Sequence, residues 1–173
     1  MSAEATVFVG PMCAGKTTAL FCHMADTPGA WLVRSVLDTR GPRVAVPPDV
    51  ARVWVGASIL DMVHELPPGA AVFVDEGFLF ADLAAGVEWL CAHGHAVFVA
   101  SIQYDYNRVW FENVRALVER HAATTYVLAG ACATPGCAAP SAFTRRTAPV
   151  ATRVAIDGAY APACAACWRP PPE

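Results

Sequence analysis

Gly10-Pro11-Met12-Cys13-Ala14-Gly15-Lys16-Thr17 fits the pattern G-x-x-x-x-G-K-[ST] at every fixed position. An apolar run, Thr6 to Val9, precedes this octapeptide, and a helical pattern begins at Lys16. In such a frame the glycines let successive backbone N–H groups turn toward a phosphate, and the helix N-terminus adds its positive dipole end. The stretch therefore predicts a phosphate-binding loop, in which Lys16 reaches the β- and γ-phosphates and the Thr17 hydroxyl binds Mg²⁺.

Lys16 is the only lysine in the chain, whereas the other eleven basic residues are all arginine. An ammonium is a compact point charge and a guanidinium is a planar fork, so a tight phosphate site can accept the first and reject the second. In a composition so strongly biased toward arginine, the single lysine supports the phosphate-site interpretation.

Short apolar runs alternate with helical patterns along the rest of the chain. Continuous apolar runs are typical of strands whose two faces are both buried. The alternation predicts an α/β fold, with a parallel sheet flanked by helices. The expected strands are Thr6 to Val9, Trp31 to Leu37, Ala71 to Val74 and Ala96 to Ala100, and the expected helices are Lys16 to Met24, Ala57 to Glu65, Leu79 to His93 and Phe111 to His121.

Two segments break this alternation. Gly41 to Val53 contains three prolines and shows no clean period, which predicts a long loop. Ala142 to Ile156 is expected to form a hairpin, and the last residues, 170–173, a disordered tail.

Two acids, Asp75 and Glu76, directly follow the apolar run Ala71 to Val74. Beside a phosphate-binding loop, an aspartate at a strand end holds Mg²⁺, usually through water. Consecutive side chains there point in different directions, so Glu76 can face a substrate and take a proton from an attacking hydroxyl.

Composition narrows the class of protein. With 173 residues, of which 55% are hydrophobic and 16% charged, the chain is too apolar for intrinsic disorder. No run of 18 apolar residues lacks Pro, Gly or a charge, and no basic segment opens a secretory signal, so we expect a soluble cytoplasmic protein without a membrane partner. A net charge of −3 without a basic tract argues against nucleic acid as the main partner.

The seven cysteines fall into two groups. Cys132-x4-Cys137 and Cys164-x2-Cys167 form two pairs separated by 26 residues, a pattern that suits a closed, tetrahedral structural zinc site. Disulfides are the competing interpretation. The isolated thiols, Cys13, Cys22 and Cys91, are expected to be small buried residues.

These elements together resemble the type II thymidine kinases, the family of cytosolic vertebrate, many bacterial and poxvirus-type enzymes, over nearly the whole chain. Residues 10–20, GPMCAGKTTAL, are similar to the family's GPMFSGKSTEL, and residues 75–80, DEGFLF, to its DEGQFF. Further matches are DTR at 38–40, ASIQYDYNRVWF at 100–111 beside AALDGTFQRKPF, AFTRR at 142–146 beside AYTKR, and Y-x3-C-x2-C at 160–167.

The resemblance implies a RecA-like sheet, a zinc-bearing lasso that closes over the base, and phosphoryl transfer from ATP to the 5′-hydroxyl of thymidine, giving dTMP for DNA synthesis by salvage. It implies a phosphate-binding α/β domain over 1–130, a lasso domain over 131–169, a homotetramer or homodimer, and inhibition by thymidine triphosphate (dTTP). It also implies a role for each site residue. Glu76 would be the general base, with Lys16 and Arg40 as further catalytic residues, and MgATP would be bound by residues 10–18, Asp38 and Asp75. The nucleoside would be bound by Met12, Leu79, Phe80, Ile102, Tyr106, Thr144, Gly158 and Tyr160. Zinc would be held by Cys132, Cys137, Cys164 and Cys167.

The chain differs from the family pattern near the nucleoside. Phe78 stands where the family has glutamine, and Leu79 where it has an aromatic residue. Three alternatives follow: a kinase for another deoxynucleoside, a catalytically silent nucleotide-binding protein, and a zinc-ribbon nucleic-acid module. The chain has both Lys16 and Glu76, which argues against a catalytically silent nucleotide-binding protein. It lacks a basic tract, which argues against a zinc-ribbon nucleic-acid module.

Overall fold

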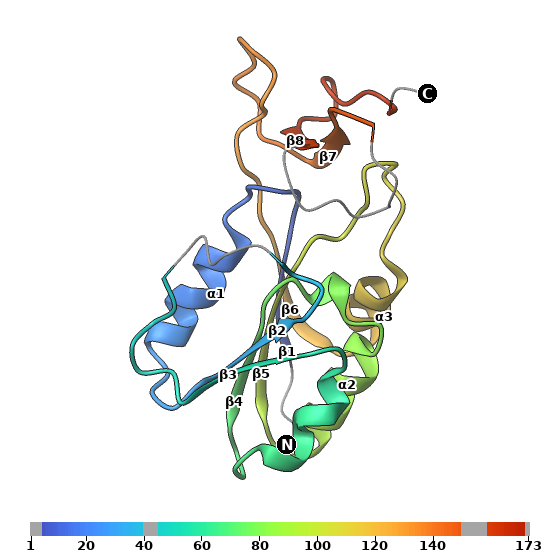
Figure 1. The fold of residues 1–173 in the computed structure, drawn as a ribbon. Coiled ribbons are helices and arrows are strands. Elements are labelled where there is room, and N and C mark those ends of the chain that lie inside the picture. The colour runs from blue at the N-terminus through green and yellow to red at the C-terminus, as the bar shows by residue number, and fades with distance from the viewer. Residues whose placement is uncertain (1–4, 40–44, 150–158, 172–173) are drawn as a thin grey trace.

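A six-stranded sheet forms the body of the protein in a computed structural model, which describes residues 5–39, 45–149 and 159–171 (Figure 1). The strand order is β3-β2-β4-β5-β1-β6, and every neighbouring pair is parallel. The predicted α/β class with a parallel sheet is thereby confirmed. The strands are β1 (Ala5–Val9), β2 (Trp31–Ser35), β3 (Arg52–Gly56), β4 (Ala71–Val74), β5 (Ala96–Ser101) and β6 (Ala122–Val127).

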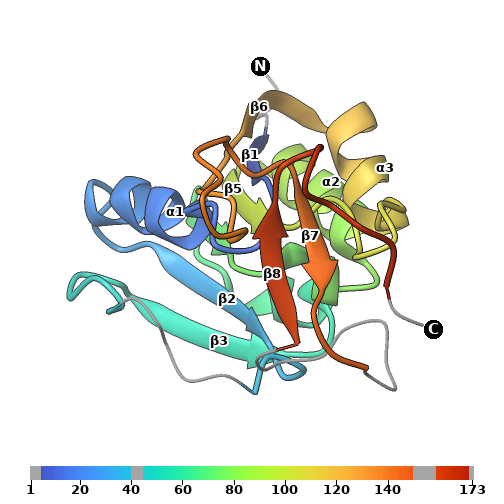
Figure 2. The same cartoon turned by 90° about the horizontal axis from the view of Figure 1, so that it is seen from above.

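Helices cover both faces of this sheet (Figures 1 and 2). Alternate residues of β1 show the division: Phe8 packs in the cluster that includes Leu20 of α1, whereas Val7 and Val9 pack in the cluster that includes Leu83 of α2. Both faces are therefore buried, which is why the strands are almost continuously apolar. The helices are α1 (Lys16–Ala25), α2 (Leu83–Ala92) and α3 (Glu112–Arg120), with 3₁₀ helices η1 (Ile59–Glu65) and η2 (Gly77–Leu79).

Both edges of the sheet differ from the sequence-based expectation. Strand β3 begins inside the stretch that was expected to be a loop, and pairs with β2 through all five residues. Its side chains alternate between exposed Val53, half-buried Trp54 and exposed Val55, a pattern typical of an edge strand. The other edge strand, β6, was not predicted at all, because Thr124 and Thr125 interrupt its apolar character. These edges form only because β2 and β1 offer backbone partners.

The helix expected from Leu79 to His93 is present but shorter, because α2 begins only at Leu83, after η2. Ahead of α2, the side-chain amide of Asn113 donates hydrogen bonds to the carbonyl oxygens of Phe78 in η2, at 3.0 Å, and of Phe80, at 2.6 Å. Likewise Ala57 to Glu65 is only the 3₁₀ helix η1, beside which Asp82 accepts hydrogen bonds from Ser58 Oγ and the Leu60 amide. Long-range side-chain contacts thus override the local helical pattern in both places.

A separate two-stranded hairpin lies beyond the carboxyl ends of the parallel strands (Figures 1 and 2). It pairs β7 (Phe143–Arg146) with β8 (Tyr160–Ala163) in antiparallel fashion. The hairpin expected over Ala142 to Ile156 contains β7, whose partner in the structure is β8, further along the chain. Residues 150–158 are outside the described residues.

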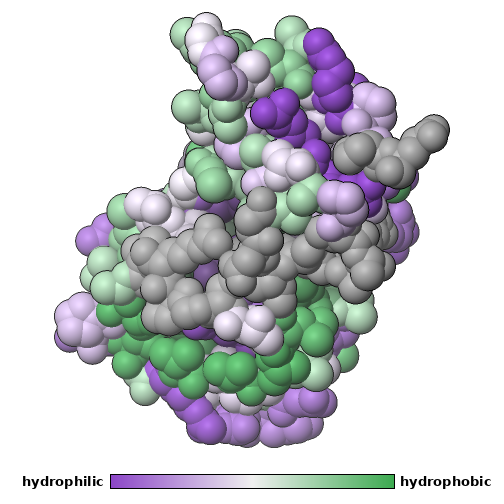
Figure 3. Space-filling model, turned by 45° about the horizontal axis from the view of Figure 1, so that its top comes forward, coloured by the Kyte–Doolittle hydropathy of each residue, from purple (hydrophilic) through white to green (hydrophobic). Residues whose placement is uncertain are grey.

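The surface carries an apolar band across the lower part of the face shown in Figure 3. Exposed large hydrophobic residues around β2 and β3 include Val36, Leu37, Val53 and Val55. Among the residues that the structure describes, no helix has the length and apolar character needed to cross a membrane.

Candidate active site

A tight turn after β1 forms the predicted phosphate-binding loop. Gly10 permits the closest packing, because a Cβ there would overlap the carbonyl oxygen of Leu128. Gly15, with φ of 81°, adopts the left-handed conformation that favours glycine and precedes α1. Gly130 packs against the loop, since a Cβ at that position would overlap the carbonyl oxygen of Cys13. The segment after β6 therefore supports the loop, which the sequence did not indicate.

The side chains of the loop differ in exposure. Cys13 is exposed with φ of 59°, and Cys22 is also exposed, so the expectation that these thiols are buried was wrong. Cys91 is half-buried. The other loop positions range from buried Pro11 and Ala14, through half-buried Met12 and Thr17, to exposed Gly15 and Thr18.

Lys16 and Thr17 begin α1 and reach in two directions. The Lys16 ammonium is buried and donates a hydrogen bond to the carbonyl oxygen of Pro11 at 2.6 Å, so it folds back over its own loop. The Thr17 hydroxyl donates to Oδ1 of Asp75 at 3.0 Å. The loop and the end of β4 are thus in direct contact, as expected for a phosphate-binding loop and a metal-binding aspartate.

Asp75 is a buried carboxylate whose charge is only partly compensated. Burial, reinforced by the neighbouring Glu76 carboxylate, raises the pKa of Asp75 to about 6. Hydrogen bonds from Thr17 and from the Glu76 amide, together with the positive charge of Arg34, oppose this rise in pKa without cancelling it. A carboxylate in this condition favours a nearby cation, which is the property required of a Mg²⁺ ligand.

Glu76 adopts a backbone conformation that is rare outside glycine, with φ of 52° and ψ of 48°. It directly precedes η2, where the amide of Phe78 donates to Ser101 Oγ at 3.0 Å. Asn113 and Ser101 therefore hold the turn that follows Glu76, and the half-buried Glu76 side chain stands beside Asp75 at the carboxyl end of the sheet. Left-handed non-glycine residues cluster at functional sites, because surrounding contacts must maintain them.

The region of the predicted DTR motif is described only in part. Asp38 forms an ion pair with Arg34 of β2 at 3.0 Å, which ties the residues after β2 to that strand. Arg34 also lowers the pKa of Asp75, so these charges belong to one electrostatic group. Arg40 and Gly158 lie outside the described residues.

The hairpin contacts both the phosphate-binding loop and the loop that follows β5. Thr144 is buried, and its Oγ1 accepts a hydrogen bond from the amide of Met12 at 3.0 Å. The rings of Tyr106 and Tyr160 stack with their centroids 5.9 Å apart. Four of the predicted nucleoside-binding residues are therefore brought together in two pairs.

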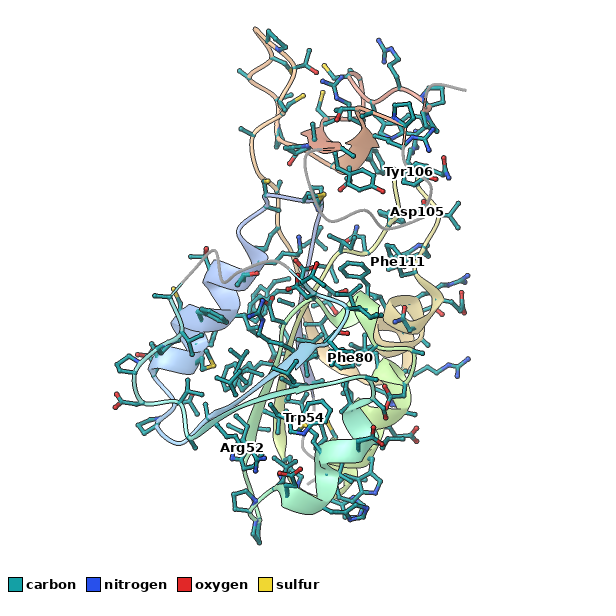
Figure 4. The ribbon with its side chains drawn as sticks, in the orientation of Figure 1. Arg52, Trp54, Phe80, Asp105, Tyr106 and Phe111 are labelled. Carbon is teal, nitrogen blue, oxygen red and sulfur yellow. The ribbon has the colours of Figure 1, made fainter. Side chains whose placement is uncertain are left out.

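The remaining predicted nucleoside residues lie at different depths. Leu79 and Ile102 are half-buried, so both retain exposed surface at the ends of η2 and β5. Phe80 is fully buried in the main core cluster. Figure 4 shows Phe80 well inside the body of the protein, while Tyr106 lies just beneath the hairpin. The Phe80 side chain contributes to the core and has no surface to offer a ligand.

Four cysteines form a compact cluster next to the hairpin. The Sγ atoms of Cys132, Cys137, Cys164 and Cys167 all lie within 4.8 Å of one another, and those of Cys137 and Cys164 are 3.8 Å apart. Tetrahedral zinc with bonds of about 2.3 Å separates its sulfurs by about 3.8 Å, whereas a disulfide needs about 2.05 Å. The geometry fits a structural metal such as zinc, and the thiols are free of disulfides.

The thiols of this cluster are unequal in acidity. Backbone hydrogen bonds at Cys164 and Thr134 lower the pKa of Cys132 to about 6. A backbone hydrogen bond at Ala139 lowers the pKa of Cys137, but its contacts with the other three thiols outweigh this and raise the pKa to about 11. Four thiolates this close repel one another unless a cation lies between them, which is consistent with a metal site.

A model of the thymidine kinase family matches residues 57–168 of this chain, which is more than half of its length. The chain belongs to the thymidine kinase family. The matched span contains Asp75, Glu76, the loop after β5, the hairpin and all four clustered cysteines. A comparison with curated proteins found no match.

Several residues that support the site in this family member escaped the sequence analysis. Arg34, Ser101 and Asn113 were not singled out, because one polar residue within an apolar strand or an amphipathic helix carries no motif. The contact of Ser101 with the turn after Glu76 is a tertiary one, from its hydroxyl to the amide of Phe78.

Proposed function

We propose that this protein transfers the γ-phosphoryl group of ATP to the 5′-hydroxyl of thymidine, giving dTMP and ADP. Membership of the thymidine kinase family supports a phosphotransferase of this kind. The observation that carries the proposal is the hydrogen bond from Thr17 to Asp75, with Glu76 next in sequence. It joins a triphosphate-binding loop, a metal-binding carboxylate and a candidate base at one end of the sheet.

On the nucleotide side, backbone N–H groups of residues 10–18 bind the phosphates. Lys16 leaves the Pro11 carbonyl and contacts the β- and γ-phosphates, and Arg40 contacts the phosphoryl group in transfer. Thr17 and Asp75 are the residues that would hold Mg²⁺, and Asp38, which pairs with Arg34, keeps its proposed role toward MgATP. When bound, Mg²⁺ supplies positive charge that offsets the negative charge of the triphosphate.

On the nucleoside side, Glu76 accepts the proton of the 5′-hydroxyl as that oxygen bonds to the γ-phosphorus. The bond between the γ-phosphorus and the bridging oxygen breaks at the same time, and its electron pair leaves on ADP. A base aligned in this way contributes about 10²- to 10⁴-fold to the rate. The rare backbone conformation of Glu76 and the bonds that hold the following turn are consistent with a side chain that must be aimed.

The thymine ring of the nucleoside would lie between the body of the protein and the hairpin. Met12, Leu79, Ile102, Tyr106, Thr144 and Tyr160 retain their proposed role, with Gly158 in the adjoining segment. Phe80 is left out, because its side chain is fully buried in the core. The hydrogen bond between Thr144 and Met12 supports this placement, since it fixes the hairpin directly over the phosphate-binding loop.

Further parts of the proposal concern the whole protein. Residues 1–130 form the ATP-binding domain and 131–169 the zinc-binding lasso, consistent with the separate sheets. The four cysteines hold one structural zinc ion. We also expect a cytoplasmic homodimer or homotetramer, inhibited by dTTP, in nucleotide salvage. The exposed valines of β3 offer apolar surface for self-association.

A kinase for a different deoxynucleoside is the second candidate. Tyr106 and Tyr160 stack on each other, and Leu79 takes the place of an aromatic residue in the family pattern. Both features change the walls of the pocket rather than the phosphate site, so they affect the choice of base and leave the reaction class intact.

Purified protein, MgATP and a panel of five deoxynucleosides test both candidates. The 5′-monophosphates are separated and quantified. Lys16→Arg protein that is expressed and purified in the same way controls for contaminating kinases. We expect dTMP as the main product. Another monophosphate as main product favours the second candidate, whereas no product from protein that binds ATP supports the catalytically silent alternative.

A further inference from the structure

Trp168 stands immediately after the last cysteine of the cluster, and the cluster determines its position. Its amide donates a hydrogen bond to the carbonyl oxygen of Cys164 at 3.0 Å, and the amide of Cys167 donates to the same oxygen at 3.2 Å. The turn from Cys164 to Cys167 therefore ends in Trp168. The order of this turn therefore sets the position of the Trp168 backbone, from which the indole ring extends.

The indole of Trp168 contacts the loop that follows β5 at two points. Its Nε1–H donates to the carbonyl oxygen of Tyr106 at 3.3 Å. Its ring lies 5.0 Å from the guanidinium carbon of Arg108, whose other aromatic contact is the ring of Phe143 in β7, at 4.3 Å. Arg108 is thus held by two aromatic rings from the C-terminal segment, a stabilising cation–π arrangement.

Arg108 needs such support, because its φ of 66° lies in the left-handed region that arginine rarely adopts. Asp105 holds the loop from within, since its Oδ1 accepts hydrogen bonds from the amides of Asn107 and Val109, each at 2.9 Å. These bonds shape the loop but do not attach it to the hairpin. At Arg108, Phe143 and Trp168 provide that attachment.

The same loop carries Tyr106, a proposed nucleoside-binding residue. Its carbonyl accepts from Trp168, its ring lies 4.9 Å from the guanidinium carbon of Arg146, and its ring stacks on Tyr160. Figure 4 shows Asp105 and Tyr106 directly below the hairpin. The position of Tyr106 therefore depends on the C-terminal segment through both its backbone and its ring.

We propose that Trp168 and Arg108 are positioning residues that couple metal binding at the four cysteines to nucleoside binding at Tyr106. A metal ion orders the Cys164–Cys167 turn, the turn positions Trp168, and Trp168 with Phe143 fixes the loop from Asp105 to Val109. Coupling of this kind is reciprocal, so nucleoside binding must raise the affinity for the metal by the same factor. The nucleoside part rests on the proposed function, whereas the ordering of the loop does not.

Hydrogen exchange tests the ordering without any substrate. The amides of Asn107, Arg108 and Val109 are all hydrogen-bonded within the loop, so their exchange reports its opening. In zinc-loaded Trp168→Ala we expect these amides to exchange about tenfold faster, because a cation–π contact and a hydrogen bond are lost. Removing zinc from the unaltered protein must speed the same amides, while those of α2 keep their rates. Unchanged loop exchange in either experiment overturns the proposal.

Conservative variants keep the test valid should Trp168→Ala fail to fold. Trp168→Phe keeps an aromatic ring but loses the N–H donor, so a smaller increase in loop exchange is expected. Trp89→Phe is the matched control, because Trp89 of α2 stacks on His93 and contacts neither Arg108 nor Tyr106. If Trp168→Phe and Trp89→Phe change the exchange rates of the loop amides equally, the proposal is contradicted.

The coupling itself is measured with zinc and thymidine. A chelator of known affinity gives the zinc affinity with and without thymidine. Thymidine must tighten zinc binding in the unaltered protein and in Trp89→Phe, and must do so less in Trp168→Ala. Equal tightening in all three overturns the coupling. A protein that neither binds nor phosphorylates any deoxynucleoside refutes the proposed function instead, and the exchange experiment still decides whether the metal orders the loop.

Discussion

The hydroxyl of Thr17 donates a hydrogen bond to Oδ1 of Asp75 at 3.0 Å, although the two residues are 58 positions apart. Thr17 lies in the first turn of α1, and Asp75 directly follows β4, which is separated from β1 in the sheet by β5. The two residues proposed to hold Mg²⁺ are therefore in direct contact, although they come from distant parts of the chain.

Replacing Glu76 by glutamine tests its role as general base. Glutamine has nearly the same shape but cannot accept the proton, so we expect turnover to fall by about 10²-fold or more while ATP affinity is retained. Steady-state kinetics and ATP titration measure the two quantities. Turnover close to that of the unaltered protein would remove Glu76 from the mechanism.

Lys16→Arg tests the need for a compact cation. Lys16 is buried and donates to the Pro11 carbonyl, and the planar guanidinium of arginine presents its charge and donors to a phosphate in a different geometry from the compact ammonium. We expect severe loss of activity with an unchanged circular dichroism spectrum and melting temperature. An active arginine variant would show that the single lysine of the chain is incidental.

Asp75→Asn should separate stability from function. Because burial raises the pKa of Asp75 to about 6, its charge opposes folding at neutral pH when no metal is bound. Asparagine still accepts the Thr17 hydrogen bond without a charge, so we expect the ligand-free protein to gain about 1–3 kcal/mol at pH 7. Chemical denaturation measures this gain, and ATP titration should show weaker Mg²⁺-dependent binding.

The pH dependence of that stability difference has a definite sign. The folded pKa of Asp75 lies above its ordinary value of 3.8, so the unfavourable charge is fully present above pH 6 and absent once the carboxyl is protonated in both states. The advantage of Asp75→Asn should therefore shrink as pH falls from about 6 to about 4. An advantage that grows toward acid pH would show that the carboxylate is stabilised in the folded protein.

Elemental analysis tests the metal centre. Protein prepared without chelators should contain one zinc per chain, since the four Sγ atoms all lie within 4.8 Å of one another. Cys164→Ser should lose the metal and destabilise the hairpin. Cys22→Ser, which changes an exposed cysteine of α1, should retain both metal and stability. Zinc-free protein with full stability would rule out a structural metal.

The choice of base can be ranked by kcat/KM at saturating MgATP. We expect thymidine to be best, then deoxyuridine, then deoxycytidine, with purine nucleosides poorest. A methyl group in an apolar pocket is worth only about 1–3 kcal/mol, so discrimination against deoxyuridine should be modest. A ring with the wrong donors and acceptors leaves buried polar groups unpaired and should be rejected more strongly. Deoxycytidine or a purine above thymidine would favour the second candidate function.

The turn after β1 that is proposed to bind phosphate, the acids after β4 and the cysteine pairs were all located from sequence. Each is a local pattern, and each depends on backbone geometry or ligand spacing that neighbouring residues specify. The octapeptide from Gly10 to Thr17 needs only a strand before it and a helix after it, and both were visible as apolar periodicity. The parallel sheet followed from the same alternation.

Only the tertiary structure determined which of these pieces meet. Strand β6 and the turn after Glu76 depend on distant partners, namely the backbone of β1 and the amide of Asn113. Phe80 matched a family motif, yet its place in the core was decided by packing. Trp168 carried no motif at all. Its contacts with Arg108 and Tyr106 exist because the cysteine turn delivers it to a loop some 60 residues earlier, and no local pattern encodes a contact of that range.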